Sequence, residues 1–253
     1  MIELNHIQQQ TSFKILLVGD DCIDVYQYGT IDRLSPEAPV PVFVPTRKEE
    51  RKGMAGNVVR NLQALGCEVN YLFDKTSVKT RLIDERSRQQ IVRIDNDAMS
   101  TPITFDTAIP AVYDAVVVSD YNKGTVSYEL IEELIALSIP IFIDTKKTDL
   151  GRMQGAWVKI NELEYSKIKS ECSGLIVTRG SRGASVINPK IDVAAPSVEV
   201  VDVTGAGDTF LAALTYQYLN TGDIEQAIRF ANTASAVTVQ HLGVYAPTLK
   251  EMG

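Results

Sequence analysis

Short apolar runs and amphipathic segments alternate along this chain. Four runs rich in Val and Ile are expected to form buried strands: Ile15–Val18, Ala115–Val118, Pro140–Ile143 and Leu175–Thr178. Four longer segments have apolar residues at helical spacing: Asn57–Leu65, Ser127–Leu137, Ala206–Leu219 and Ile224–Gln240. Strands that alternate with helices predict an α/β fold, in which a mainly parallel sheet is covered by helices on both faces. Ligands of such sheets bind beyond the carboxyl ends of the strands.

Two segments depart from this alternation. Val40–Val44 is flanked by prolines, which is typical of an extended edge strand. Within residues 79–95, the stretch Gln90–Ile94 resembles a half-exposed strand. We expect a small β-layer that stands off the main sheet as a lid, with segments at about 25–46 and 79–95, although an ordinary edge hairpin would give the same pattern. The whole chain, 1–253, is expected to be one domain.

Composition and charge narrow the range of functions. Hydrophobic residues make up 45% of the chain and charged residues 23%, as in soluble globular proteins. A net charge of −7 argues against nucleic acid as the main partner. The longest purely apolar run near the N-terminus is Ile15–Val18, which is too short for a signal peptide or a membrane span.

Few residues are available for metal or redox chemistry. The cysteines are odd in number and lack metal-ligand spacing, so they indicate reduced thiols of a cytoplasmic protein: Cys22, Cys67 and Cys172. His6 and His241 are the only histidines, so a histidine-based nucleophilic triad or a His-rich metal site is not expected.

The most informative motif is Val201-Asp202-Val203-Thr204-Gly205-Ala206-Gly207-Asp208-Thr209-Phe210, which precedes an apolar helical segment. Its two glycines permit a tight turn and close ligand approach. The amides of residues 205–207 would open a helix N-terminus and bind an anion. Asp208 could orient a hydroxyl and take its proton during phosphoryl transfer. The alternative is a glycine turn with an acidic first-turn residue favoured by the helix dipole.

Further candidates lie near the N-terminal strand. Asp24 follows this strand and could accept hydrogen bonds from two sugar hydroxyls, or it could be a solvated loop acid. Gly53 and its small neighbours permit close backbone approach or a hinge beside Asn57. From the pattern alone we favour Asn57 as a helix N-cap over a ligand contact. No G-x-x-x-x-G-K-[ST] phosphate loop is present, so residues 205–208 are the best anion site.

Two oxygen-bearing pairs are candidates for cation binding. Asn161 and Glu164 follow the strand-like segment Ala156–Ile160 and would share one face of a helical turn. They could hold the water shell of Mg²⁺, or they could simply cap a helix. Asp202 and Thr204 could donate oxygens to a cation or tie their turn together.

Several blocks, taken together, resemble the ribokinase-like (PfkB) carbohydrate kinases. The Asp202–Phe210 block resembles their C-terminal signature. The other blocks resemble most closely the kinase domain of heptose-7-phosphate kinase/ADP-heptose synthase. These blocks are Gly19-Asp20…Asp24…Tyr26…Tyr28-Gly29, Arg33–Val42, Ala55–Val58, Ser87–Gln90, Ser119–Gly124 and Phe230-Ala231-Asn232. The resemblance covers residues from about Lys14 to Pro247 and implies a ribokinase-like three-layer α/β/α fold.

This resemblance implies transfer of the γ-phosphate of ATP to a sugar hydroxyl. Asp208 would be the base, and Gly205, Ala206 and Gly207 would form the anion hole. Asp24 and Asn57, beside Gly53, would hold sugar hydroxyls. Lys123 and Lys146 are candidates for the phosphate of the substrate or the phosphates of ATP. Asn161 and Glu164 would act on Mg²⁺ and phosphate, and Asp202 and Thr204 match a monovalent-cation site for which K⁺ is the candidate. The expected nucleotide contacts are Thr178, Arg179, Gly180 and Asn232.

The heptose branch implies a 7-phosphate acceptor and a 1,7-bisphosphate product. From the net charge and the short apolar runs we expect no nucleic-acid or membrane partner. Relatives often dimerise through lid strands, which fits the apolar Val40–Val44 edge. Two alternatives stay open: a kinase of another sugar or sugar phosphate, and a non-catalytic sugar- or nucleotide-binding protein on the same fold. We expect the helix N-terminus to stabilise ionised Asp208 and so to make it a weak base.

The chain departs from its apparent relatives in specific places. A strand–helix unit is expected to be missing after Phe73, and a helix after Lys169. The paired glycines of the lid hinge are replaced by Gly53-Met54. No nucleotidyltransferase domain follows Gly253 in this sequence, so we expect the chain to supply only the kinase step. The catalytic block itself is intact, which favours catalysis over binding alone.

Overall fold

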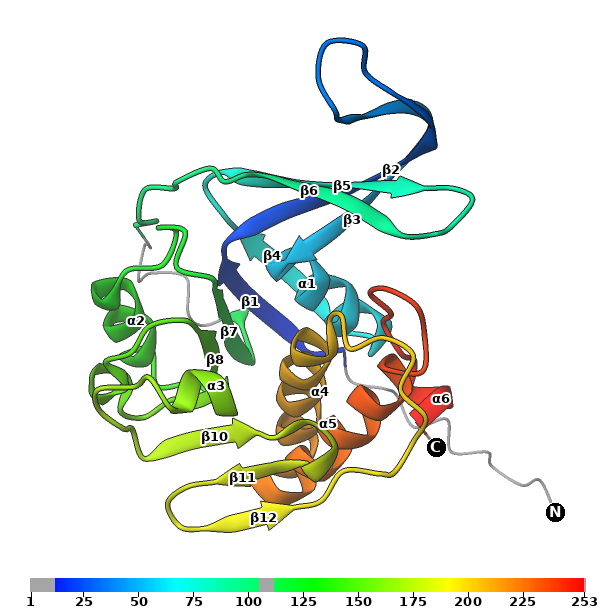
Figure 1. Cartoon of the computed structure of the whole chain (residues 1–253). Helices are drawn as coiled ribbons and strands as arrows, with labels where there is room; N and C mark the ends of the chain where they lie inside the picture. The colour runs from blue at the N-terminus through cyan, green and yellow to red at the C-terminus, as the bar shows by residue number, and fades with distance from the viewer. Residues whose placement is uncertain (1–11, 105–111, 253) are drawn as a thin grey trace, which may run out of the picture.

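The computed structural model describes residues 12–104 and 112–252 of the chain. These residues form two β-sheets, and helices pack on both faces of the larger sheet (Figure 1). The predictions that concern residues 1–11, including His6, lie outside the described ranges.

The main sheet has eight strands in the order β12-β11-β10-β9-β8-β7-β1-β4. Their bounds are β1 (Lys14–Gly19), β4 (Glu68–Leu72), β7 (Ala115–Asp120), β8 (Ile141–Thr145), β9 (Trp157–Asn161), β10 (Gly174–Thr178), β11 (Ala184–Val186) and β12 (Ile191–Val193). Along this order, all neighbouring pairs from β10 through to β4 are parallel. Strand β11 is antiparallel to both of its neighbours, β10 and β12. The predicted mainly parallel sheet is therefore confirmed.

Helices cover both faces of this sheet and form three layers. On one face lie α1 (Ala55–Ala64), α4 (Ala206–Thr221), α5 (Ile224–Thr238) and α6 (Leu249–Met252). On the other lie α2 (Tyr128–Ile135) and α3 (Glu162–Tyr165), together with the 3-10 turn η2 (Leu150–Met153). A second 3-10 turn, η3 (Gly180–Arg182), follows β10.

Strand β1 explains why the central strands are apolar throughout. Ile15 and Leu17 belong to the core beneath α1, α4 and α5, while Leu16 and Val18 belong to the core beneath α2. Because successive side chains of a strand point to opposite faces, both faces need apolar residues here.

The second sheet has four strands in the order β3-β2-β5-β6. Their bounds are β2 (Asp21–Leu34), β3 (Pro41–Met54), β5 (Thr76–Asp84) and β6 (Gln90–Asn96). Asp20 alone separates β1 from β2, and β3 leads directly into α1, so this sheet grows from the carboxyl end of β1 (Figure 1). We call it the lid sheet. Both predicted lid segments lie in it, and their function as a lid stays a prediction.

Two places in the fold correspond to the segments expected to be missing. Residues 73–75 lead directly from β4 to β5, which leaves β4 at the edge of the main sheet. Between α3 and β10 the structure contains no helix. Among the residues described, no helix is long and apolar enough to cross a membrane.

Candidate active site

The glycine motif forms a turn at the N-terminus of α4. Gly205 has a left-handed backbone with φ 79°, and a β-carbon there would lie 2.7 Å from Nδ2 of Asn57. A β-carbon at Gly207 would lie 2.9 Å from Nζ of Lys159. The amide of Ala206 donates to the carbonyl of Val203 at 3.3 Å, whereas those of Gly205 and Gly207 make no hydrogen bond to another described residue. Two free amides at a helix N-terminus can bind an anion.

Asp208 lies in the first turn of α4, and only 6% of it is exposed. Its Oδ2 accepts a hydrogen bond from Nδ2 of Asn57 at 2.8 Å, and its Oδ1 accepts one from the Tyr121 hydroxyl at 3.0 Å. Burial raises the pKa of Asp208 to about 6, although both hydrogen bonds act to lower it. The expectation that Asp208 is a weak base is therefore wrong, because desolvation by burial is the largest influence on its pKa.

The structure gives Asn57 a role other than the N-cap that the pattern favoured. Helix α1 begins at Ala55 and its N-cap residue is Met54, so Asn57 lies inside the helix. Its side chain is fully buried and donates to Asp208 across 151 positions of sequence. The expectation of helix capping is wrong because the helix begins earlier than its apolar spacing indicates. By contrast, Ser127, the first residue of a predicted helical segment, is the N-cap of α2.

A buried ion pair that sequence reasoning missed lies beside the glycine turn. Lys159 of β9 and Asp144 of β8 are opposite each other in the parallel pair, and Nζ lies 2.6 Å from Oδ2. The same Nζ donates to the carbonyl of Gly207 at 3.4 Å. Oδ1 of Asp144 is buried without a hydrogen-bond partner among the described residues. A lysine within an otherwise apolar strand was the available signal.

Asn161 and Glu164 form a reciprocal capping box at the start of α3. The Asn161 side chain accepts from the amide of Glu164, and the Glu164 carboxylate accepts from the amide of Asn161, both at 2.8 Å. Lys146 donates to the same carboxylate and lies 5.3 Å from the ring centre of Tyr121. Helix capping is therefore present, and it places Glu164 and Lys146 together at the carboxyl ends of β8 and β9.

Asp24 lies within β2, and 14% of its side chain is exposed. It accepts a hydrogen bond from the guanidinium of Arg81. A β-carbon at Gly53 would lie 2.2 Å from its Oδ2, so the opposite strand must have glycine there. These contacts exclude a solvated loop acid and leave a carboxylate held at the base of the lid sheet.

Lys123 has a different environment from the one we expected. Its Nζ pairs with Asp97 at 2.5 Å, and its amide donates to Asp20 at 3.0 Å. Among the residues that the structure describes, its hydrogen-bond and ion-pair partners are Asp97 and Asp20 rather than Asp208 or Glu164.

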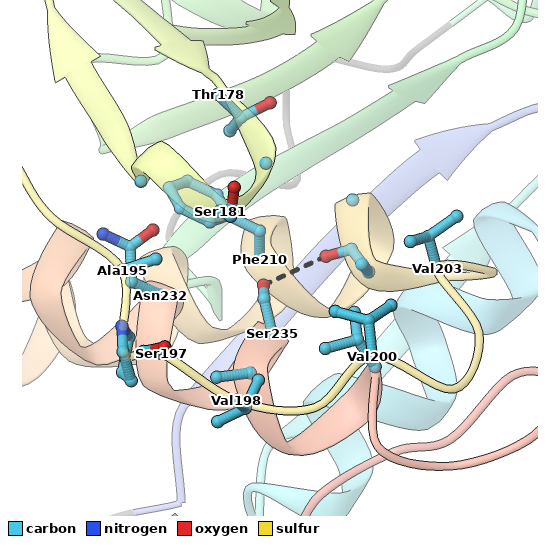
Figure 2. A pocket seen from close by; sticks show the side chains of 17 residues that line it. Thr178, Ser181, Ala195, Ser197, Val198, Val200, Val203, Phe210, Asn232 and Ser235 are labelled. Atoms are coloured by element: carbon cyan, nitrogen blue, oxygen red, sulfur yellow. Dashed lines mark hydrogen bonds between the residues drawn. The ribbon is translucent and has the colours of Figure 1, made fainter.

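A cavity of about 290 Å³ extends from the N-terminus of α4 between η3 and α5 (Figure 2). Three predicted nucleotide contacts line it: Thr178, Gly180 and Asn232. Apolar side chains supply most of the wall, including Val198, Val200, Val203, Phe210 and Val239. Ala206 and Gly207 line the same cavity, so a flat apolar group bound there could extend an anionic tail to the glycine turn. Arg179 is absent from this lining and interacts with Ser185 and Asp192.

Asp202 ties together two loops near the glycine turn. It accepts from the amide and hydroxyl of Thr204 at 2.9 and 2.7 Å, and from the amide of Gly243 at 2.8 Å. Although burial opposes ionisation, these hydrogen bonds hold the pKa of Asp202 below its usual value. Within the described ranges, no cluster of three or more His, Cys, Asp and Glu side chains could hold a metal ion.

Comparison with known proteins agrees with this geometry. The profile of the family described as "pfkB family carbohydrate kinase" matches residues 157–251. The chain is 35% identical to the bifunctional protein HldE of a Nitratiruptor species, over 94% of the chain and 64% of that protein. The chain thus spans less than two thirds of the length of this relative. A ribokinase from Thermotoga maritima has the same fold, with a TM-score of 0.70, 17% identity and coverage of 95% of this chain and 98% of that one.

A further relative matches almost from end to end. The D-beta-D-heptose 7-phosphate kinase of Bordetella bronchiseptica is 31% identical to the chain, over 94% of the chain and 95% of that protein. This alignment runs over 301 positions, whereas the chain has 253 residues, so the relative contains segments that this chain lacks. The resemblance drawn from the sequence motifs is confirmed: the chain belongs to the pfkB family of carbohydrate kinases.

Proposed function

We propose that this chain transfers the γ-phosphate of ATP to a hydroxyl of a sugar phosphate. The acceptor we propose is D-glycero-D-manno-heptose 7-phosphate, and the product is the 1,7-bisphosphate. The observation that carries the proposal is the placement of Asp208, a buried carboxylate with a raised pKa, one residue after the anion-binding glycine turn. The name of the Bordetella relative supports the choice of acceptor.

Asp208 would act as the general base. The acceptor oxygen forms a bond to the γ-phosphorus while the bond from that phosphorus to the β–γ bridging oxygen breaks, and ADP leaves. The hydroxyl proton passes to the Asp208 carboxylate, which Asn57 and Tyr121 hold in place. The free amides of Gly205 and Gly207 stabilise the charge on the transferring group. Lys159, which is paired with Asp144, lies beside Gly207 on the same side.

The cavity beside the glycine turn would hold the nucleotide. Its apolar wall would accommodate the base, and three nucleotide contacts implied by the resemblance line it: Thr178, Gly180 and Asn232. Asp24, held by Arg81, would accept hydrogen bonds from the hydroxyls of the acceptor. Lys146, which is paired with Glu164, stays a candidate for the phosphates of ATP.

Mg²⁺ fits the oxygens near Glu164. The Glu164 carboxylate lies at a strand end beside Lys146, and the unpartnered Oδ1 of Asp144 supplies a further oxygen in the same region. Bound there through water, Mg²⁺ would neutralise charge on the phosphate oxygens of ATP. Asp202 accepts hydrogen bonds from the amide and hydroxyl of Thr204, and we assign no step to a monovalent cation at that place.

Two further proposals concern the whole protein. We infer that it is cytoplasmic, because its three cysteines are buried free thiols. We also infer a homodimer formed through the lid sheet, because Val44, Val92 and Ile94 are exposed on that sheet and Val40 is exposed just before β3.

The test is a panel of acceptors with ATP and Mg²⁺, in which ADP release is measured and the product is identified by phosphorus NMR. The panel contains heptose 7-phosphate, fructose 6-phosphate and ribose. Turnover that is fastest with heptose 7-phosphate is the expected result. Fastest turnover with another acceptor would show that the chain is a kinase of another sugar or sugar phosphate and would reject the heptose assignment. Nucleotide binding without turnover on any acceptor would contradict the kinase proposal and favour a binding protein.

A further inference from the structure

A chain of buried polar side chains joins three helices of the main domain. Helix α4 packs against both α1 and α5 (Figure 1). Asn57 and Asn61 come from α1, Thr209 comes from α4, and Thr238 comes from α5. Each of these four residues is at most 1% exposed. Only Asn57 takes part in the steps described above, although a polar side chain in a helix core is costly unless it is hydrogen-bonded.

Continuous hydrogen bonds connect this chain to the carboxylate of Asp208. The hydroxyls of Thr238 and Thr209 lie 3.0 Å apart, and the Thr209 hydroxyl donates to Oδ1 of Asn61 at 2.9 Å. Nδ2 of Asn61 donates to the backbone carbonyl of Asn57 at 2.8 Å and lies 3.4 Å from Oδ1 of the same residue. Nδ2 of Asn57 then donates to Asp208.

These partners fix the orientation of the Asn61 amide. The Asn57 carbonyl accepts but cannot donate, so the NH₂ group of Asn61 must face it. A flipped amide would place an oxygen against that carbonyl oxygen with no proton between them. Oδ1 of Asn61 therefore faces Thr209, and among the described residues this hydroxyl is its one hydrogen-bond donor.

Asn61 in turn restricts the amide of Asn57. On one side of this amide lies the NH₂ group of Asn61, and on the other lies the Asp208 carboxylate, which only accepts when it is ionised. If the Asn57 amide were flipped, its oxygen would face the carboxylate and its NH₂ group would face another NH₂ group. Both contacts would be repulsive, so the favourable orientation is the one that donates to Asp208.

The Thr209 hydroxyl is the part of this arrangement that a substitution can remove most cleanly. Without it, Oδ1 of Asn61 would be buried and unpaired, which is costly and favours rotation of the Asn61 side chain. Once Asn61 turns away, the amide of Asn57 is free to turn as well.

We propose that Asn61 and Thr209 are positioning residues that fix the Asn57 side chain with its NH₂ group toward Asp208. The inference rests on the proposed role of Asp208 as the base and adds two side chains that do not line the nucleotide cavity. When the Asn57 donor turns away, the ionised carboxylate loses a stabilising hydrogen bond, and the pKa of Asp208 rises.

Other charged and titratable groups also face Asp208 and influence its ionisation. They lie in or directly after strands β7, β8 and β9: Tyr121, Asp144, Lys146 and Lys159. The side-chain hydrogen bonds of Asn61 and Thr209 in the described ranges go to other partners. A change at Asn61 or Thr209 therefore acts on Asp208 through Asn57.

The test measures the pKa of the Asp208 carboxyl by carbon NMR of protein with isotope-labelled aspartate, in which Asp208→Asn assigns the resonance. Thr209→Val removes the hydroxyl and keeps the shape of the side chain, and Thr209→Ser keeps the hydroxyl. Asn61→Ala removes the next member of the chain. The matched control is Thr215→Val, because Thr215 is a fully buried threonine of the same helix whose hydroxyl donates to the Leu211 carbonyl.

The pKa of Asp208 is expected to rise by about half a pH unit or more in Thr209→Val and in Asn61→Ala, because a hydrogen bond to the carboxylate is lost. The acidic limb of kcat/KM should move upward with it. Thr209→Ser and Thr215→Val should keep the wild-type pKa. An unchanged pKa in Thr209→Val, or an equal rise in Thr215→Val, overturns the inference, and Thr209→Val decides alone if Asn61→Ala does not fold.

The NMR titration does not require turnover, so the inference and the proposed function can fail separately. A raised pKa in Thr209→Val without phosphorylation of any acceptor by the wild type supports the positioning role and contradicts the kinase function. Phosphorylation by the wild type together with an unchanged pKa in Thr209→Val supports the kinase function and overturns the positioning role.

Discussion

Asp208 combines a buried position with two hydrogen-bond donors, and these influences act on its pKa in opposite directions. Desolvation raises the pKa and is the largest effect, while the Asn57 amide and the Tyr121 hydroxyl stabilise the carboxylate. The resulting pKa of about 6 suits a group that must be ionised near neutral pH and still accept a proton. Tyr121 is thus a positioning residue that lowers the pKa of Asp208.

Replacing Tyr121 by Phe tests this role through the pH dependence of kcat/KM. Asp208 must be ionised to act as a base, so activity falls as the pH drops through its pKa. Tyr121→Phe removes a donor to the carboxylate, and the acidic limb should move upward by about one pH unit. The phosphate of the acceptor also titrates at about pH 6 and contributes equally to the profiles of both enzymes. The quantity to measure is therefore the difference between the acidic limbs of the variant and the wild type.

Tyr245→Phe is the matched control, because it also removes a tyrosine hydroxyl that donates to a carboxylate, that of Glu251. Its acidic limb should coincide with that of the wild type. Coincident limbs for Tyr121→Phe and the wild type would show that Tyr121 does not set the basicity of Asp208.

At the scale of elements, Met54 joins β3 to α1 with an unfavourable backbone. It has φ 48° and ψ −133°, although it is not glycine, and only 6% of it is exposed. Such conformations cost about 1–3 kcal/mol for residues with a β-carbon. Glycine adopts such a conformation without this cost, so Met54 strains the junction between β3 and α1.

Met54→Gly and Met54→Ala separate backbone strain from the loss of the buried side chain. Both remove the methionine side chain, but only glycine relieves the backbone. We expect the glycine variant to unfold with a free energy about 1 kcal/mol higher than that of the alanine variant, measured by urea denaturation. Where φ is negative, a variant with alanine usually has a free energy of unfolding about 0.4–1 kcal/mol higher than one with glycine. A Met54→Ala variant that is more stable than Met54→Gly would therefore contradict the strain.

The elements also show which features a sequence can predict. The central strands are apolar on both faces, so β1 and β7 stand out as continuous runs. Strand β4 was missed because it is an edge strand with Glu68 and Asn70 exposed. The contact of Asn57 with Asp208 and the pairing of Lys159 with Asp144 depend on how distant segments align, which local patterns do not contain.

At the scale of the whole molecule, the lid sheet has two different faces. One carries Arg47, Arg51 and Arg81, and the other carries an apolar stripe. On the stripe, Leu82 lies opposite Val92, and Thr80 lies opposite Ile94. Val92 is 46% exposed and Ile94 is 52% exposed, which is unusual for adjacent apolar residues of one sheet. A second copy of the chain that covers this face would bury them.

Sedimentation equilibrium of the wild type and of Ile94→Lys tests the dimer. The wild type should dimerise, and the variant should associate at least about tenfold more weakly, because a charge would be buried without a partner. Leu163→Lys, which places a lysine on α3 away from the lid sheet, should dimerise as the wild type does. A monomeric wild type, or a variant that dimerises equally well, would contradict the lid interface.

The most direct measurement is the rate of ADP formation from ATP and heptose 7-phosphate by the wild type and by Asp208→Asn. The asparagine keeps the size of the side chain but cannot take a proton. We expect kcat to fall by about 10²–10⁴, with ATP affinity unchanged in a parallel binding titration. A variant whose kcat stays within a few-fold of the wild type would contradict the assignment of Asp208 as the base.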